Sequence, residues 1–343
     1  MRSPVPTIKD VALAAGVSIT TVSHTINGTR RVSDGLRERV LKAMKELDYR
    51  PNVLARSLRV GQTQTIGLVI PDSSNLFFAE MARAIEDIGY QHGYSVILCN
   101  SDGNTEKQRR YIQTLVDKQV DGIVFISSGD SREDLQYLLD NQIEIVVVDR
   151  DVPSIQTDIV LLDNELAGYQ ATRYLIELGH RRIALILGPS DLTPSAHRAD
   201  GYRRALLEAG LKSSPDYEVS GDFQIQGGEK AALRLLGLRP RPSAVFVCND
   251  MMAIGVIRGA RCLGLRLPED LSVVGFDDIA LARAMYPALT TMAQPVSEMA
   301  RMATGLLLDR LNGRTSDEPR QRIMLPAELI IRDSCCCWDD IDN

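Results

Sequence analysis

Apolar residues recur at helical spacing in two short stretches near the start of the chain. Between Thr7 and Gly16 the apolar positions are three and four residues apart, which predicts a helix with one buried face. Thr7 can cap this helix, because Asp10 stands three residues later as in a capping box. A second pattern of the same kind follows Ser18 and leaves its polar residues outside. We therefore predict two short helices joined by a tight turn at Gly16, a residue that tolerates the left-handed conformation.

A third helix is predicted over residues 34–48, where Lys and Arg line the side opposite a stripe of Leu, Val and Met. Pro51 prevents this helix from continuing, and the segment 51–61 follows it. Leu54 and Leu58 lie four residues apart in that segment, which is unlike a plain linker of Gly, Ser and Pro. A helix of at most two turns is marginal in water, so this segment needs a partner to hold it.

From Gln64 onward the pattern changes to short apolar runs that alternate with amphipathic helices. This alternation predicts parallel sheets with right-handed crossovers. There are too many strands for one sheet and the rhythm breaks near Asp163, so we expect two doubly wound subdomains. The expected strands are Thr65–Ile70, Ser95–Cys99, Gly122–Ile126, Ile145–Asp149, Arg182–Leu187, Ala244–Cys248 and Ser272–Phe276, and the expected helices include 78–91, 105–118, 165–178, 198–209 and 249–263.

The charge distribution separates the first part of the chain from the rest. Residues 1–60 hold eleven Lys and Arg against five Asp and Glu, a net charge of +6, whereas the remainder carries −12. A basic segment on an acidic body is typical of a nucleic-acid-binding module on a scaffold that does not itself bind nucleic acid. The polar residues Thr20, Thr21 and His24 of the second helix have the size to reach base edges in a major groove. On this stretch alone, a helical hairpin with a solvated polar face remains an alternative.

Other classes of function find little support in the sequence. No apolar run approaches the roughly 18 residues of a membrane span, and the first residues lack the apolar stretch of a secretory signal, so we expect a cytoplasmic protein. There is no Walker, GxSxG, HExxH or dinucleotide-binding motif, and we expect no enzyme activity, cofactor or metal. Cys99, Cys248 and Cys262 lie in apolar patterns and are expected to be buried. The run Cys335–Cys337 is expected to form an exposed, oxidisable tail, and His180 to help end a helix.

The first 58 residues resemble the DNA-binding headpiece of the LacI/GalR family of bacterial transcription regulators. Beyond the two helices, the match continues through Arg31-Val32-Ser33, Arg37-Glu38-Arg39-Val40, Tyr49-Arg50-Pro51-Asn52 and Ala55-Arg56-Ser57-Leu58. The resemblance implies a helix-turn-helix headpiece over 1–50, a hinge helix over 51–61 and a homodimer on a palindromic operator in double-stranded DNA. The residues implied to contact DNA are Thr20, Thr21, His24, Arg30 and Arg59, with Leu58 wedged between central base pairs.

The remainder, 62–343, resembles the periplasmic sugar-binding proteins, a fold that this family shares. The implied fold class is α/β: a small all-α headpiece and a two-subdomain body with parallel sheets. By this resemblance the chain crosses between the subdomains more than once. One subdomain is expected to comprise about 62–162 and 292–324, and the other 163–291 and 325–334.

Polar and aromatic residues that directly follow strands are candidates for a ligand site, because ligands of open α/β sheets lie beyond the carboxyl ends of the strands. Carboxylate, guanidinium and carboxamide groups can meet several hydroxyl groups, and phenylalanine rings can stack on a sugar. Each residue alone could equally be a helix cap or a loop residue. Their order also resembles the pocket of periplasmic ribose-binding proteins. The predicted set is Asn75, Phe77, Phe78, Asp149, Arg150, Arg198, Phe223, Asn249, Asp277 and Gln294.

The small-molecule effector stays open between two alternatives. The loop 188–198 and the residues 221–223 look like the branch of the family that responds to ribose or purines. Arg150 stands where a purine site would want an aromatic platform, and Leu192 where it would use arginine. Ribose or a related sugar is therefore our first expectation, and a purine nucleobase is the alternative. A sugar-binding protein without a DNA role is a further alternative, which the basic headpiece argues against.

Overall fold

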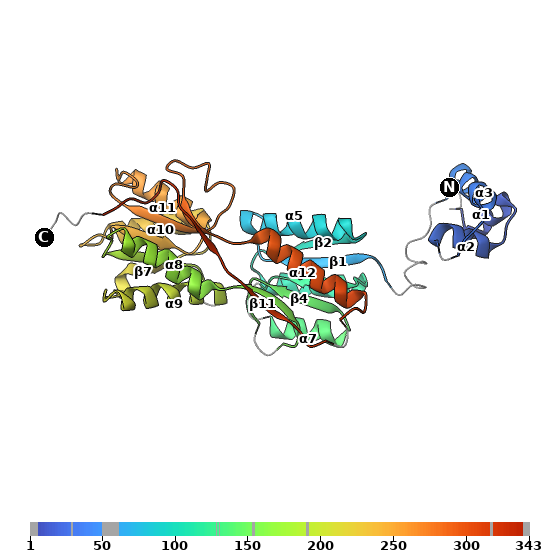
Figure 1. Ribbon diagram of the computed structural model, residues 1–343, viewed down its shortest axis with the longest axis horizontal. Coiled ribbons are helices and arrows are strands. Elements are labelled where there is room, and N and C mark those ends of the chain that lie inside the picture. The colour runs from blue at the N-terminus through green and yellow to red at the C-terminus, as the bar shows by residue number, and fades with distance from the viewer. Residues whose placement is uncertain are drawn as a thin grey trace. The chain divides into compact units, whose positions relative to one another are not determined.

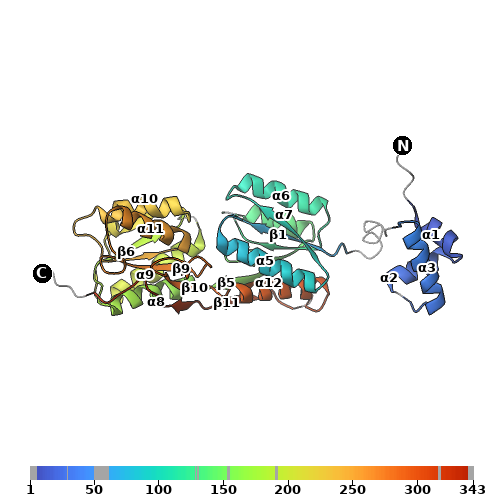
Figure 2. The same cartoon turned by 90° about the horizontal axis from the view of Figure 1, so that it is seen from above.

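The computed structural model describes residues 6–28, 30–49, 62–127, 129, 131–152, 155–189, 192–315 and 318–338. The chain forms two compact units that meet in the sequence between Thr63 and Gln64 (Figures 1 and 2). The predicted hinge segment 51–61 lies outside the described residues. The roles assigned to Leu58 and Arg59 therefore stay predictions.

The first unit is the predicted three-helix headpiece, formed by α1 (Ile8–Ala15), α2 (Ile19–Asn27) and α3 (Asp34–Glu46). The backbone nitrogen of Thr7 donates to Asp10 Oδ2 at 2.7 Å, and Gly16 ends α1 with φ 60°. The backbone nitrogen of Thr21 donates to Ser18 Oγ at 3.1 Å at the start of α2. One side chain from each helix is fully buried at the centre, namely Val11, Val22 and Val40. The predicted helices and turn are confirmed.

The second unit contains two sheets, each the centre of one subdomain. In the first subdomain the strand order is β11-β5-β4-β3-β1-β2 and all pairs are parallel. In the second it is β12-β10-β9-β8-β6-β7, with only β12 antiparallel. The strands of the first sheet are β1 (Thr65–Ile70), β2 (Ser95–Asn100), β3 (Gly122–Phe125), β4 (Glu144–Val148), β5 (Asp158–Leu162) and β11 (Arg322–Leu325). Those of the second are β6 (Ile183–Leu187), β7 (Glu218–Ser220), β8 (Ala244–Val247), β9 (Ser272–Asp277), β10 (Thr290–Ala293) and β12 (Glu328–Ile330).

Helices cover both faces of each sheet, as in a doubly wound fold. The first subdomain carries α5 (Leu76–Gln91), α6 (Thr105–Asp117), α7 (Arg132–Asp140) and α12 (Val296–Leu311). The second carries α8 (Asn164–Glu177), α9 (Thr193–Glu208), α10 (Ile225–Leu236) and α11 (Asp250–Cys262), with a short 3-10 helix at Pro215–Tyr217. The α/β fold class with two parallel-sheet subdomains is confirmed. None of the described helices has the length and apolar character that a membrane span requires.

The chain crosses between the two subdomains after β5, after β10 and after β11. The second crossing brings α12 from late in the sequence to lie beside α5 of the first subdomain, as both views show (Figures 1 and 2). β10 stays paired with β9 through Ala293, so this crossing falls at Gln294 and Pro295 rather than at the expected residue 292. Leu325 still pairs with Leu162 in the first sheet, one residue beyond the expected boundary.

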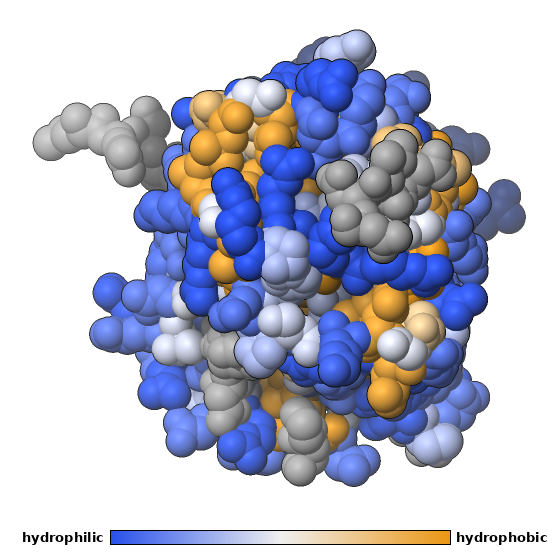
Figure 3. Space-filling view, turned by 90° about the vertical axis from the view of Figure 1, so that its left-hand side faces the viewer, coloured by the Kyte–Doolittle hydropathy of each residue, from blue (hydrophilic) through white to orange (hydrophobic). Residues whose placement is uncertain are grey.

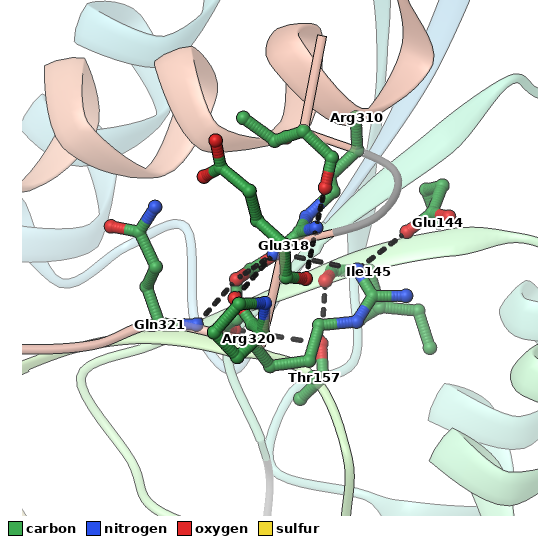
Figure 4. A network of polar contacts seen from close by, with 10 residues as sticks. Glu144, Ile145, Thr157, Arg310, Glu318, Arg320 and Gln321 are labelled. Carbon is green, nitrogen blue, oxygen red and sulfur yellow. Dashed lines mark hydrogen bonds and ion pairs between the residues drawn. The ribbon is translucent and has the colours of Figure 1, made fainter. Parts of the chain in front are cut away.

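A buried ion-pair network fastens the end of α12 to the first sheet (Figure 4). Asp158 begins β5 with a side chain that is fully buried, and it accepts hydrogen bonds from Arg310 Nε at 2.9 Å and from Arg320 Nη1 at 3.2 Å. Arg310 also donates to three backbone carbonyls of the loop that follows α12. Burial alone would raise the pKa of Asp158, but the hydrogen bonds from Arg310 and from the backbone of Gln321 hold it below the usual value.

Two of the C-terminal cysteines and Cys262 differ from expectation, whereas His180 does not. Cys335 lies against the second subdomain, where Sγ donates to Val273 O at 3.2 Å and burial raises the pKa of its thiol to about 12. The expectation of an exposed tail therefore holds for Cys337 but is wrong for Cys335 and Cys336, which are partly buried. His180 helps to end α8 as expected, because its backbone nitrogen donates to Leu175 O at 3.2 Å. Its ring is fully buried, with Nδ1 2.9 Å from Ser243 Oγ. Cys262 is exposed rather than buried.

The end face of the second subdomain, at the left of Figure 1, is mixed in character. Separate hydrophobic patches lie between larger hydrophilic areas on this face (Figure 3). This is the ordinary surface of a globular domain, on which apolar atoms remain partly exposed.

Candidate functional site

One cavity between the two subdomains is lined by all ten predicted ligand-binding residues and by Pro194. We call it the effector pocket. Its walls come from the first subdomain at 75–78 and 149–150, from the second at 194–277, and from the crossing at Gln294. The free volume is about 20 Å³, and a second cavity of about 250 Å³ adjoins it. The residues that were selected because they follow strands thus lie together in the structure, although they are far apart in the sequence. Their role in binding stays a prediction.

Three pocket residues have backbone conformations that are unusual for non-glycine residues. The φ angles are 67° for Asp149, 64° for Phe223 and 111° for Asp277. Such conformations cost about 1–3 kcal/mol each and tend to cluster at ligand sites. The two aspartates do not cap following helices, the alternative considered from the sequence. Their side chains instead meet Arg150 and Gln294 across the pocket wall.

The two asparagines of the pocket do serve as helix caps. Asn75 Oδ1 accepts from the backbone nitrogen of Phe77 at 3.0 Å and begins α5. Asn249 Oδ1 accepts from Met252 N at 2.9 Å, and its Nδ2 donates to Phe223 O at 3.1 Å. The cap holds each side chain in a fixed orientation at the pocket wall. Asn249 also fixes the loop that carries the Phe223 ring.

Arg198 is the most firmly held cation of the site. Its Nε donates to Asn164 Oδ1 at 2.8 Å and its Nη1 to Cys248 O at 2.5 Å. The guanidinium carbon lies 3.5 Å from the centre of the Phe276 ring, a cation–π contact. The backbone of α9 reaches this position because α8 has Gly168 at the crossing, where a Cβ would lie 2.3 Å from Arg198 O.

Arg150 is held from the first subdomain. It donates to Ser127 O, its Nε lies 3.6 Å from Asp149 Oδ2, and its guanidinium carbon lies 5.5 Å from the centre of the Phe78 ring. Each guanidinium group is thus fixed beside an aromatic ring on its own wall. Planar donors with locked orientations can give directional hydrogen bonds to ligand oxygens.

Burial has the largest influence on the pKa values of the two pocket carboxylates, Asp149 and Asp277. It raises the pKa of Asp149, opposed by the charges of Arg150 and Arg198. It also raises the pKa of Asp277 to about 7, opposed by Arg198 and by the hydrogen bond from Gln294. Near neutral pH the Asp277 carboxyl can therefore present either an acceptor or a donor to a ligand.

One acceptor of the pocket is left for a ligand. Gln294 Nε2 donates to Asp277 Oδ1 at 2.8 Å, and the side chain is 7% exposed. Within the part of the chain that the structure describes, Gln294 Oε1 has no hydrogen-bond partner. A buried acceptor without a partner costs about 1–3 kcal/mol, which a hydroxyl or N–H group of a ligand can recover.

Sequence reasoning missed the residues that support the pocket from behind. Asn164 and Phe276 hold Arg198, and Asp250 holds the loop after β9. Asp250 is fully buried, its Oδ2 accepts from Ile279 N at 3.0 Å, and Oδ1 accepts from Thr291 Oγ1 at 2.7 Å. These bonds tie together β9 and β10, the strands that lead to Asp277 and to the crossing at Gln294. The only sequence signal was the position of Asp250 directly after a strand and Asn249.

We expect Asp250→Ala to weaken effector binding by about tenfold, because the unpaired backbone nitrogen of Ile279 costs roughly 1–3 kcal/mol and loosens that wall. Asp250→Asn is the matched control, since its amide can accept from Ile279 N and donate to Thr291 Oγ1. Ligand titration and thermal unfolding of both variants check this. Equal ligand affinity in both variants would reduce Asp250 to a residue of the general core.

The predicted DNA-reading residues lie on and beside α2. Thr20 and Arg30 are exposed, and His24 is half-buried one helical turn after Thr20. Thr21 is also half-buried, with its Oγ1 2.9 Å from Ser18 Oγ. The hydroxyl of Thr21 therefore also belongs to the helix cap. Among the described residues, no group of His, Cys, Asp and Glu side chains could hold a metal ion.

Comparison with known proteins agrees with this arrangement. A family model for bacterial regulatory proteins of the lacI family matches residues 7–52, and one for a periplasmic binding protein-like domain matches residues 172–335. The chain is 42% identical over 330 residues to the transcriptional repressor PurR of Vibrio vulnificus (strain CMCP6), with 96% of this chain and 98% of that protein covered. It is also 42% identical over 331 residues to the ribose operon repressor of Escherichia coli (strain K12), with 96% and 99% covered.

A solved structure extends the likeness to the whole architecture. The lac repressor dimer bound to operator and the anti-inducer ONPF matches with a TM-score of 0.87 at 27% identity, covering 97% of this chain and 100% of that one. The headpiece and the two-subdomain body define a ligand-responsive, DNA-binding transcriptional regulator rather than an enzyme. The chain belongs to the LacI family of bacterial regulatory proteins, which confirms the family resemblance seen in the sequence.

Proposed function

We propose that the protein is a cytoplasmic, dimeric repressor whose effector is ribose or a closely related sugar, bound by the ten residues of the effector pocket. The observation that carries this proposal is the convergence of all ten on one cavity, with carboxylates, guanidinium groups and carboxamides between phenylalanine rings. The free acceptor at Gln294 Oε1 supports a ligand with hydroxyl or N–H donors. The identity to a relative named ribose operon repressor points in the same direction.

A purine nucleobase is the second candidate. The equal identity to a relative named PurR favours it. Two residues argue against a purine. Arg150 lines the pocket at the position where the family resemblance implies an aromatic ring for purine binding. Leu192 lines the adjoining cavity at the position where it implies an arginine. The polar pocket with two phenylalanines from α5 suits a sugar better.

The proposed mechanism is closure of the subdomains on the ligand. The free volume of about 20 Å³ holds about one water molecule, so a sugar ring enters only when the walls move apart. Asp149 and Arg150 hold it from one side, and Arg198 and Asp277 from the other. A ligand that binds the closed arrangement better shifts the population toward it. In a two-fold dimer this movement changes how two headpieces meet a near-palindromic operator.

Isothermal titration of the full chain with D-ribose, hypoxanthine and guanine tests the effector. We expect heat of binding with D-ribose alone. Binding of hypoxanthine or guanine with no response to ribose would favour the purine candidate. Operator binding is measured in the same samples, so that a sugar-binding protein without a DNA role is recognised.

For the headpiece, we propose that Thr20, Thr21, His24 and Arg30 contact the operator. His24→Ala is then expected to cost about 1–3 kcal/mol of operator affinity and to relax the preference at one base pair per half-site. Selection from random DNA measures that preference. Lys42→Ala, an exposed cation of α3, is the control and should leave the selected sequence unchanged. The same motif from wild type and His24→Ala would make His24 a packing or phosphate contact only.

A further inference from the structure

The effector pocket adjoins a cavity of about 250 Å³ that residues of both subdomains line. We call it the mouth. The two cavities share Asn75, Phe78, Arg150 and Phe223, so a ligand in the pocket faces the mouth directly. Any substituent that a sugar ring carries beyond the pocket would therefore lie there.

Three carboxylates line the mouth. Asp72 and Asp102 belong to the first subdomain, and Asp222 belongs to the second. Hydrogen bonds from Ser74 and Gln224 lower the pKa of Asp72 despite its partial burial, and the bond from Lys107 lowers the pKa of Asp102. Asp222 Oδ1 accepts from the backbone nitrogen of Gln224 at 2.9 Å.

The cations of this region are engaged by other groups. Lys107 Nζ lies 2.5 Å from Asp102 Oδ2, and Arg150 lies beside Asp149. The lining of the mouth itself has three aspartates and one arginine, and Lys107 pairs with only one of the three. A negatively charged substituent would thus meet an excess of like charge, which is disfavoured by electrostatic complementarity.

Closure of the subdomains strengthens the repulsion of a negatively charged substituent. Gln224 Nε2 donates to Asp72 Oδ2 at 2.9 Å, so a residue of the second subdomain holds the carboxylate of the first at the mouth. Asp72 and Asp222 line the mouth from opposite subdomains, so opening of the subdomains would move the two carboxylates apart. The repulsion of an anionic ligand is therefore greatest in the closed arrangement, on which the proposed response depends.

We propose that the carboxylates of the mouth make this regulator selective for uncharged effectors and exclude their phosphorylated forms. The proposal rests on the proposed function, namely that the effector pocket binds a sugar. The effector is then a polyhydroxylated ring without a phosphoryl group.

Isothermal titration with D-ribose and D-ribose 5-phosphate tests this on the full chain. We expect the phosphate ester to bind at least about 100-fold more weakly to the wild type, as like charges suppress wrong partners. In the double variant Asp72→Asn/Asp222→Asn the ratio of the two dissociation constants, phosphate ester over ribose, should fall by about tenfold. The double variant Glu86→Gln/Asp216→Asn removes one exposed carboxylate from each subdomain outside the mouth and should keep the wild-type ratio. The ratio should also fall at high salt, because partly exposed charges are screened.

The outcomes separate this inference from the proposed function. Equal affinity of wild type for both compounds overturns the charge selection while the sugar site stands. An unchanged ratio in Asp72→Asn/Asp222→Asn would show that the pocket excludes the phosphate by shape, which also overturns the proposal. Absence of ribose binding overturns the proposed function and this inference with it.

Discussion

Asp277→Ala is expected to abolish the effector response while the free protein still binds its operator. The loss of effector affinity should be about 2–5 kcal/mol, the usual cost of removing one partner of a buried charge pair. Burial raises the pKa of Asp277, the charge of Arg198 partly offsets this effect, and Gln294 Nε2 donates to Asp277 Oδ1 at 2.8 Å. In the variant Gln294 loses its buried acceptor and Arg198 loses a nearby negative charge. Titration with the effector and operator binding with and without it measure the two parts of this prediction.

A neighbouring carboxylate supplies the control. Asp278 pairs with Arg332 at 2.6 Å and does not line the effector pocket. Asp278→Ala should therefore keep the effector affinity within about threefold, as for a partly exposed ion pair. Asp149→Ala on the opposite wall should behave like Asp277→Ala. Retained effector affinity in both pocket variants would place the binding site elsewhere.

The pocket lining could be predicted because a single topological rule governs it. In a parallel sheet the carboxyl ends of the strands meet at one edge, so residues such as Asp149 and Asp277 converge although many residues separate them. The headpiece was predictable for a local reason. Its capping box at Thr7 and its turn at Gly16 are encoded by neighbouring residues.

The supporting residues could not be predicted because tertiary contacts define them. Asn164 looks like any polar residue at a helix start, and only the packing of α8 against α9 brings it to Arg198. The strand β5 was not among the expected strands, and it begins with the charged Asp158. The sequence shows that charge, but not the two arginines that pair with it.

The start of α9 and the environment of the C-terminal tail could not be predicted from the sequence either. The helix expected from 198 begins at Thr193 in α9, because Pro194 is favoured in the first turn where no backbone donor is needed. Cys335 is partly buried and His180 fully buried by contacts across the second subdomain that leave no local pattern. Burial of this kind depends on which surfaces meet, and one sequence gives no measure of that.

Arg310→Met is expected to lower the free energy of unfolding of the first subdomain by about 3–5 kcal/mol, because it leaves Asp158 buried without its main partner. The side chains of Arg310 and Asp158 are 3% and 0% exposed. Arg301→Met on the same helix is the control. Its pair with Glu298 is largely exposed, and its loss should cost less than about 1 kcal/mol. Denaturant unfolding of the two variants compares these costs, and equal costs would contradict the role given to Arg310.

The difference in unfolding free energy between wild type and Arg310→Met should depend on pH in one direction. The pKa of folded Asp158 lies below the ordinary value of 3.8, so the folded state favours the ionised carboxylate. Its contribution to stability is then fully present above that ordinary value and is lost as the pH falls through the lowered pKa of the folded state. The gap in unfolding free energy between wild type and Arg310→Met should accordingly be constant near neutral pH and shrink in acid. A gap that grew on acidification would mean that Asp158 is protonated in the native network and that Arg310 stabilises α12 through its backbone carbonyls alone.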